Sequence, residues 1–129
     1  MKAAKKAQPS NKRNTCPCPT REILDRIGDK WSILIIITLA NAPHHKYRFS
    51  ELQRNIDGIS QRMLTSTLRF LERDGFVYRY FYPEIPPRTE YELTSLGKSI
   101  YATFQQLKTW IESNWPKIKS AREKYDAEK

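Results

Sequence analysis

Apolar residues recur every three or four positions near the start of the chain, and this spacing predicts two helices in succession. The first follows Pro19, has Thr20 as its N-cap and ends at Gly28. Asp29 caps the second, at about residues 30–40, which is apolar almost all round and is expected at the centre of a small core. Three apolar residues share one face of the first helix: Ile23, Leu24 and Ile27.

The middle of the chain predicts a helix-turn-helix, because a short helix and a longer one flank a turn signal. Residues 44–49 are interpreted as a linker, with a candidate short strand at Tyr47–Phe49. Ser50 opens the short helix, and Gln53 completes a capping box with it. This helix is expected to end near the Asp57-Gly58 turn.

The longer helix, from Ser60 to about Asp74, has one apolar face and one basic face. Leu64, Leu68 and Leu71 lie on the side expected to pack, and guanidinium and hydroxyl groups lie opposite. At 1.5 Å per residue it is about 22 Å long, enough to lie in a DNA major groove. An ordinary solvated face is the alternative for this helix alone. The residues expected at bases or phosphates are Gln61, Arg62, Thr65, Ser66 and Arg69, with Arg73 nearer the DNA backbone or solvent.

Two runs rich in Tyr, Phe, Val and Thr, Val77–Tyr82 and Thr89–Leu93, predict a β-hairpin. Three prolines stiffen the connector and are expected to present Arg88 at the tip, within reach of a phosphate or a minor groove. The alternative for Arg88 is an ion pair with Glu84 or Glu90. The basic residues of the hairpin strands and tip are Arg79, on the first strand, and Arg88.

Thr94 caps the last helix, and Trp115-Pro116 is expected to end or kink it. The order of elements predicts an α+β fold that is mainly α: a winged helix-turn-helix with an extra C-terminal helix. The 129 residues suit one domain, predicted at residues 16–118. Residues 1–15 contain five basic residues and no acid, which predicts a disordered basic arm, and residues 119–129 predict a polar tail.

The charge balance favours an anionic partner, because 23 Lys and Arg against 14 Asp and Glu give a net charge of +9. The longest apolar run, Ile33–Ile37, is far shorter than the roughly 20 residues of a transmembrane helix. No secretory signal is recognised, so the cytoplasm is the expected compartment and no membrane partner is expected. No catalytic motif, cofactor motif or metal-ligand spacing is present, and His44 and His45 are interpreted as turn residues.

Several motifs, in order, resemble the HxlR-type family of bacterial winged helix-turn-helix transcriptional regulators. They extend from Cys18 to about Trp110. The chain departs from the family pattern at Asp29, where many members have a second glycine, and in a longer turn at residues 44–47. The motifs are Cys18-Pro19, Ile27-Gly28-Asp29-Lys30-Trp31, Arg48-Phe49-Ser50-Glu51-Leu52, Gly58-Ile59-Ser60-Gln61-Arg62-Met63-Leu64-Thr65, Leu68-Arg69-Phe70-Leu71-Glu72-Arg73-Asp74-Gly75, the hairpin from Tyr82 to Tyr91, and Leu93-Thr94-Ser95-Leu96-Gly97.

The resemblance implies a homodimer that binds a partly palindromic operator in double-stranded DNA, with the first and last helices forming the interface. The sequence independently favours a dimer, because the last helix has more apolar surface than a small core needs. The alternative is that the last helix simply covers its own core. The expected interface residues are Ile23, Phe104, Leu107, Trp110 and Ile111.

The resemblance also implies a cysteine sensor in some members, at the position of Cys18. Cys18 stands just before a helix start, where the helix dipole stabilises the reactive thiolate. The alternative is a cysteine that only fills space, and Cys16 is the second thiol. We therefore expect a homodimeric, sequence-specific DNA-binding transcriptional regulator without enzymatic activity, responsive to oxidants or electrophiles through Cys18. The alternative is a winged-helix module that binds another protein.

Overall fold

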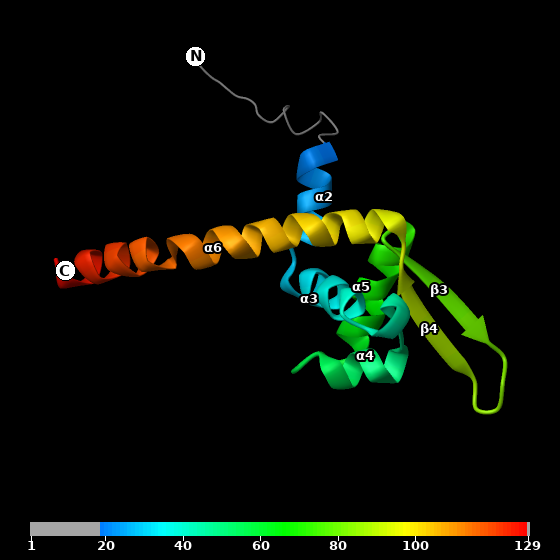
Figure 1. Cartoon of the computed structure of the whole chain (residues 1–129). Coiled ribbons are helices and arrows are strands. Elements are labelled where there is room, and N and C mark those ends of the chain that lie inside the picture. The colour runs from blue at the N-terminus through cyan, green and yellow to red at the C-terminus, as the bar shows by residue number, and fades with distance from the viewer. Residues whose placement is uncertain (1–18, 129) are drawn as a thin grey trace, which may run out of the picture.

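A computed structural model describes residues 19–128 of the chain as a helical body with a small sheet at one end. Figure 1 shows the last helix as a long rod that runs past this body, so that its C-terminal end lies far from the hairpin. The elements are α2 (Pro19–Ile27), α3 (Lys30–Ala40), the 3₁₀ turn η1 (Pro43–His45), β2 (Lys46–Arg48), α4 (Phe49–Asn55), α5 (Gln61–Arg73), β3 (Val77–Tyr82), β4 (Arg88–Leu93) and α6 (Ser95–Ala127).

The three strands form an antiparallel sheet in the order β2-β4-β3. In this register Tyr82 pairs with Arg88, and Arg79 pairs with Tyr91. The short strand expected near Tyr47 is therefore present, and it joins the hairpin as an edge strand. The fold is the winged helix-turn-helix that the sequence predicts, mainly helical with one small sheet and an extra C-terminal helix.

Helix α3 lies at the centre of the core, as its nearly continuous apolar surface predicts. Ile35, Ile36 and Leu39 are fully buried, while Leu34 is partly exposed on the far side. The rest of the buried cluster comes from α2, α4, α5, the sheet and the segments that join them: Ile27, Leu52, Ile56, Ile59, Leu64, Leu68, Leu71, Phe76, Val77, Tyr91 and Leu93.

Side-chain caps fix the starts of three helices at the predicted residues. Asp29 accepts a hydrogen bond from the backbone N–H of Ser32, and Ser60 accepts one from that of Met63. Thr94 caps α6 and also donates to the carbonyl of Gly75 at 2.6 Å, which joins the end of α5 to the start of α6. Gly75 has a φ of +85°, so the αL conformation explains why glycine follows α5.

Two helix starts differ from the sequence prediction. Thr20 lies inside α2, because Pro19 is already helical; a proline fits the first helical turn, where its missing N–H costs nothing. The Ser50–Gln53 capping box is also wrong. Helix α4 begins two residues earlier, and the carboxylate of Glu51 accepts from the backbone N–H of Arg48 at 2.8 Å.

Helix α6 does not end at Trp115-Pro116, which is one of the two outcomes that the sequence predicts there. It continues through Pro116 to Ala127, so residues 119–127 are helical rather than a separate polar tail. Proline removes one backbone hydrogen bond, to the carbonyl of Glu112, at a typical cost of about 3 kcal/mol. Glu112 is exposed, so water can satisfy that carbonyl. Among residues 19–128, no helix is long and apolar enough to cross a membrane.

Candidate nucleic-acid interface

Helix α5 separates its residues into a packed face and an outward face, as predicted. Leu64, Leu68 and Leu71 are buried against the core. The side chains of Arg62, Ser66 and Arg69 are exposed on the outside of the same helix. Helix α5 therefore presents cations and hydroxyl groups to whatever approaches its outer surface.

The five predicted residues of α5 line one shallow surface depression of about 530 Å³. Within it, the Thr65 hydroxyl donates to the backbone carbonyl of Gln61 at 2.8 Å. The oxygen of that hydroxyl can still accept a hydrogen bond, whereas its own proton is in use. The structure thus brings together Gln61, Arg62, Thr65, Ser66 and Arg69.

Helices α4 and α5 are joined by the turn that makes them a helix-turn-helix. Gly58 in this turn has a φ of +81°, a conformation that other residues rarely adopt. Ile56 and Ile59 on either side of it are buried in the core. The turn is thereby anchored, and it fixes the angle at which α5 leaves the body.

The prediction that Arg88 lies at the tip of the hairpin is wrong. Arg88 is the first residue of β4, and the tip is residues 83–87. Its guanidinium lies 3.1 Å from Glu84 and 3.2 Å from Glu90, over the ring of Tyr82. Two carboxylates and an aromatic ring therefore hold this side chain within the wing, which is the alternative that the sequence left open.

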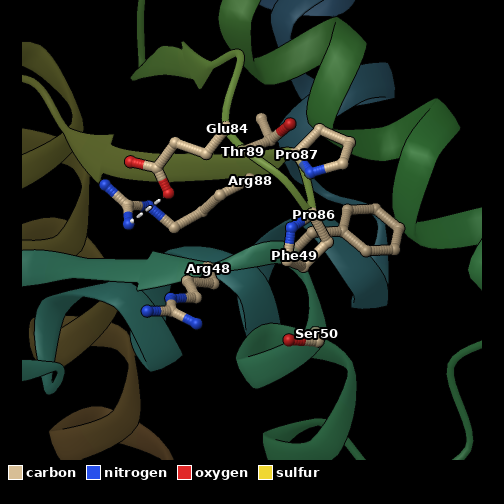
Figure 2. A pocket seen from close by; sticks show the side chains of 8 residues that line it. All are labelled: Arg48, Phe49, Ser50, Glu84, Pro86, Pro87, Arg88 and Thr89. Carbon is tan, nitrogen blue, oxygen red and sulfur yellow. Dashed lines mark hydrogen bonds and ion pairs between the residues drawn. The ribbon is translucent and has the colours of Figure 1, made fainter.

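A cleft of about 620 Å³ separates the hairpin tip from the start of α4. Figure 2 shows the ring of Phe49 beside Pro86, with Arg48 and Arg88 toward the same side of the cleft. Phe49 packs partly into the core, so this contact braces the tip against the body. Arg48 is exposed and was missed by the sequence argument, because its position beside the tip depends on the pairing of β2 with β4.

Arg79 on β3 is a second residue that the sequence argument undervalued. It is exposed and pairs across the sheet with Tyr91, which is only 8% exposed. Burial raises the pKa of the Tyr91 phenol, and the neighbouring Arg79 guanidinium opposes that rise. The alternation of Arg79 with tyrosines along β3 is the signal that could have found it.

The outer sheet face carries a separate polar cluster around Tyr80. Its hydroxyl donates to Glu92 at 2.9 Å, and this hydrogen bond raises the pKa of Tyr80. The ammonium of Lys46 lies 5.1 Å from the centre of the same ring. These contacts tie the three strands together on the side that faces away from the core.

The predicted interface residues, on α6 and α2, fall into two groups. Leu107, Trp110 and Ile111 are 52%, 55% and 44% exposed, so this chain leaves them uncovered. Phe104 and, on α2, Ile23 are partly buried and pack against the chain's own core. Each group therefore needs a different test of its part in an interface.

Cys16 and Cys18 lie outside the described residues, as does the basic arm. His44 and His45 lie in the turn η1, both with positive φ. In the part of the chain that the structure describes, no group of three or more His, Cys, Asp or Glu could hold a metal ion.

Comparison with known families and proteins gives a consistent result. Residues 26–119 match the family described as HxlR-like helix-turn-helix. The HTH-type transcriptional regulator YtfH of Escherichia coli (strain K12) is 42% identical over 106 residues, 82% of each chain. The match includes the helix-turn-helix, the hairpin and most of α6.

Solved structures of similar sequence share the fold. The transcriptional regulator ytfH from Salmonella typhimurium has a TM-score of 0.71 at 40% identity, covering 82% of this chain and 92% of that one. The redox regulator HypR in its reduced form has a TM-score of 0.68 at 40% identity, covering 80% and 99%.

Proposed function

Since the chain belongs to the HxlR-like helix-turn-helix family, we propose that it is a homodimeric transcriptional regulator that recognises a specific DNA sequence. The observation that carries this proposal is the outward face of α5, where five polar or basic residues line one depression. The similar regulators give no reason to expect catalysis.

Helix α5 is the recognition helix of this proposal. Its 13 residues make it about 20 Å long, which suits a major groove. Gln61, Arg62, Thr65 and Ser66 are near its N-terminal end, the part of a recognition helix that usually reaches base edges. Arg69, one turn beyond Thr65, contacts a phosphate or a base.

The operator is partly palindromic and binds a dimer of this chain. The exposed apolar side chains of Leu107, Trp110 and Ile111 support this proposal, because apolar surface of this kind is stabilised by burial. Two-fold symmetry then places the two α5 helices in half-sites about one DNA turn, ~10 bp, apart.

Cys18 is the proposed site at which oxidants or electrophiles alter DNA binding. The support is its place one residue before Pro19, where α2 begins, and the similarity of the chain to the redox regulator HypR. A helix N-terminus favours the thiolate form, which is the nucleophile that attacks oxidants and electrophiles.

The experiment that tests this function is selection of bound fragments from genomic DNA, with and without an oxidant. The proposal expects a shared two-fold motif whose recovery changes with the oxidant. Recovery of fragments without any common motif would favour the alternative, a winged-helix module that binds another protein. Equal recovery of the motif with and without the oxidant would contradict the proposed sensing role of Cys18 and leave the proposed DNA recognition in place.

A further inference from the structure

The tip of the wing presents an apolar side chain where the sequence predicts a cation. Ile85 is 99% exposed, more than any other large apolar side chain among residues 19–128. Four of the five tip residues are apolar, namely Ile85 and three exposed prolines, and none is basic. A single exposed apolar residue is common on protein surfaces. Ile85 differs because the structure fixes its position at the end of a projecting hairpin.

Several contacts hold the tip in one shape. Three of its five residues are prolines, whose rings fix the backbone angle φ. The backbone N–H of Glu84 donates to the carbonyl of Tyr82 at 2.8 Å, and the Glu84 carboxylate lies 3.1 Å from Arg88. Figure 2 shows Pro86 beside the ring of Phe49, which packs against the core. A tip that is already rigid loses little conformational entropy when a ligand covers its apolar end.

The hairpin carries this tip away from α6 and toward the start of α4. Strand β3 follows α5 and strand β4 leads into α6, so the tip lies at the other end of the hairpin (Figure 1). Tip residues line one cleft with Arg48, Phe49 and Ser50, where the helix-turn-helix begins. Each strand has six residues and is about 20 Å long, whereas the major groove is about 12 Å wide. The wing is therefore long enough to reach beyond the groove that α5 is proposed to occupy.

The charges near the tip indicate an anionic partner. Arg48 is exposed beside the tip, and none of the ion pairs within residues 19–128 includes it. The whole chain has a net charge of +9. The DNA minor groove has phosphates along its edges and sugar and base edges inside, and it accepts apolar side chains such as Ile and Pro. An apolar tip beside an available guanidinium matches both parts of that groove.

We propose that Ile85 enters the minor groove beside each half-site and packs against its sugar and base edges, while Arg48 binds a phosphate at the edge of that groove. Arg88 then holds the shape of the tip. The 2-amino group of guanine projects into the minor groove and obstructs the isoleucine, so the wing adds a preference for A·T pairs at this position. This inference rests on the proposed DNA-binding function.

The test uses the full chain and duplexes built around a sequence that it selects from random DNA. At each flanking position, a G·C pair is compared with an inosine·C pair, which lacks only the 2-amino group and presents the same major-groove edge. Dissociation constants are measured for wild type, Ile85→Ala and Ile85→Leu. The matched control is Leu96→Ala, which truncates a 52% exposed apolar side chain at the other end of the hairpin.

The expected result is one flanking position per half-site at which wild type, Ile85→Leu and Leu96→Ala bind the inosine duplex about tenfold more tightly than the guanine duplex. Ile85→Ala should bind both duplexes alike, about tenfold more weakly than wild type binds the inosine duplex, because the burial of the side chain is lost.

Two results would overturn the proposal: unchanged affinity of Ile85→Ala for the inosine duplex, which would favour a protein partner for the tip, or an inosine preference that Ile85→Ala retains. Failure of the wild type to select any duplex would instead overturn the proposed function, and this inference with it.

Discussion

The guanidinium of Arg26, near the end of α2, lies 3.3 Å from the carboxylate of Asp74, the residue that caps the end of α5. Both side chains are partly buried, and the Arg26 guanidinium also lies 4.9 Å from the centre of the Phe70 ring. Helix α2 is therefore attached directly to the helix that we assign to the major groove.

Replacement of Arg26 by Ala is expected to lower the free energy of unfolding by about 1–2 kcal/mol, because an ion pair and a cation–π contact are lost together. Urea unfolding measures this, with Arg26→Lys as the variant that keeps the charge. A double-mutant cycle with Asp74→Ala isolates the pair. Additive effects of the two substitutions would show that the contact contributes nothing.

The apolar face of α6 gives a prediction about assembly. Leu107→Glu combined with Ile111→Glu places two charges where burial without partners is costly, so the variant should sediment as a folded monomer. These positions are exposed in the single chain, whereas Phe104 packs on the chain's own core and its replacement would also disturb folding. A soluble dimer of the double variant would exclude this face as the main contact.

The helix starts show which parts of the fold follow from local sequence. Asp29, Ser60 and Thr94 cap their helices as predicted, because a cap depends on residues three positions apart. Local sequence does not decide the start of α4, because two overlapping pairs are candidates for the capping box: Arg48 with Glu51, and Ser50 with Gln53. In the structure the pair is Arg48 with Glu51, and Phe49, the first residue of the helix, packs partly against the core.

The candidate site also contains some residues whose place could be predicted from local sequence and others whose place could not. The residues of α5 were predictable, since helical periodicity alone sets which side chains face outward. The place of Arg88 was not, because it depends on the hairpin register that pairs Tyr82 with Arg88 and leaves five residues for the tip.

Oxidation should distinguish the two cysteines. In the proposed dimer, diamide is expected to take two electrons and two protons from the two Cys18 thiols, one from each subunit, which then form a disulfide. We expect operator binding by Cys16→Ser to respond to diamide as the wild type does, and binding by Cys18→Ser to be insensitive. A wild type that binds DNA equally well before and after oxidation would leave Cys18 without a sensing role.

Alkaline pH should destabilise the fold through Tyr91. Its folded-state pKa is raised, chiefly by burial, so the folded protein holds the phenol proton more tightly than the unfolded chain does. The resulting stability is present below about pH 10, the unfolded pKa, and is lost as the pH rises through the folded value. The free energy of unfolding, measured with urea between pH 8 and 11, should fall less steeply with pH for Tyr91→Phe than for wild type. An equally steep fall in the two proteins would contradict this.

The central claim is that the outward face of α5 reads DNA sequence, and Arg62 tests it most directly. The measurement is the dissociation constant of wild type, Arg62→Ala and the control Lys119→Ala for a selected duplex and for a scrambled duplex of equal composition. Wild type and Lys119→Ala should prefer the selected duplex by about 10³-fold or more. Arg62→Ala should lose about 1–3 kcal/mol on the selected duplex and less on the scrambled one. Equal affinity of the wild type for both duplexes, or unchanged binding of the selected duplex by Arg62→Ala, would contradict this account.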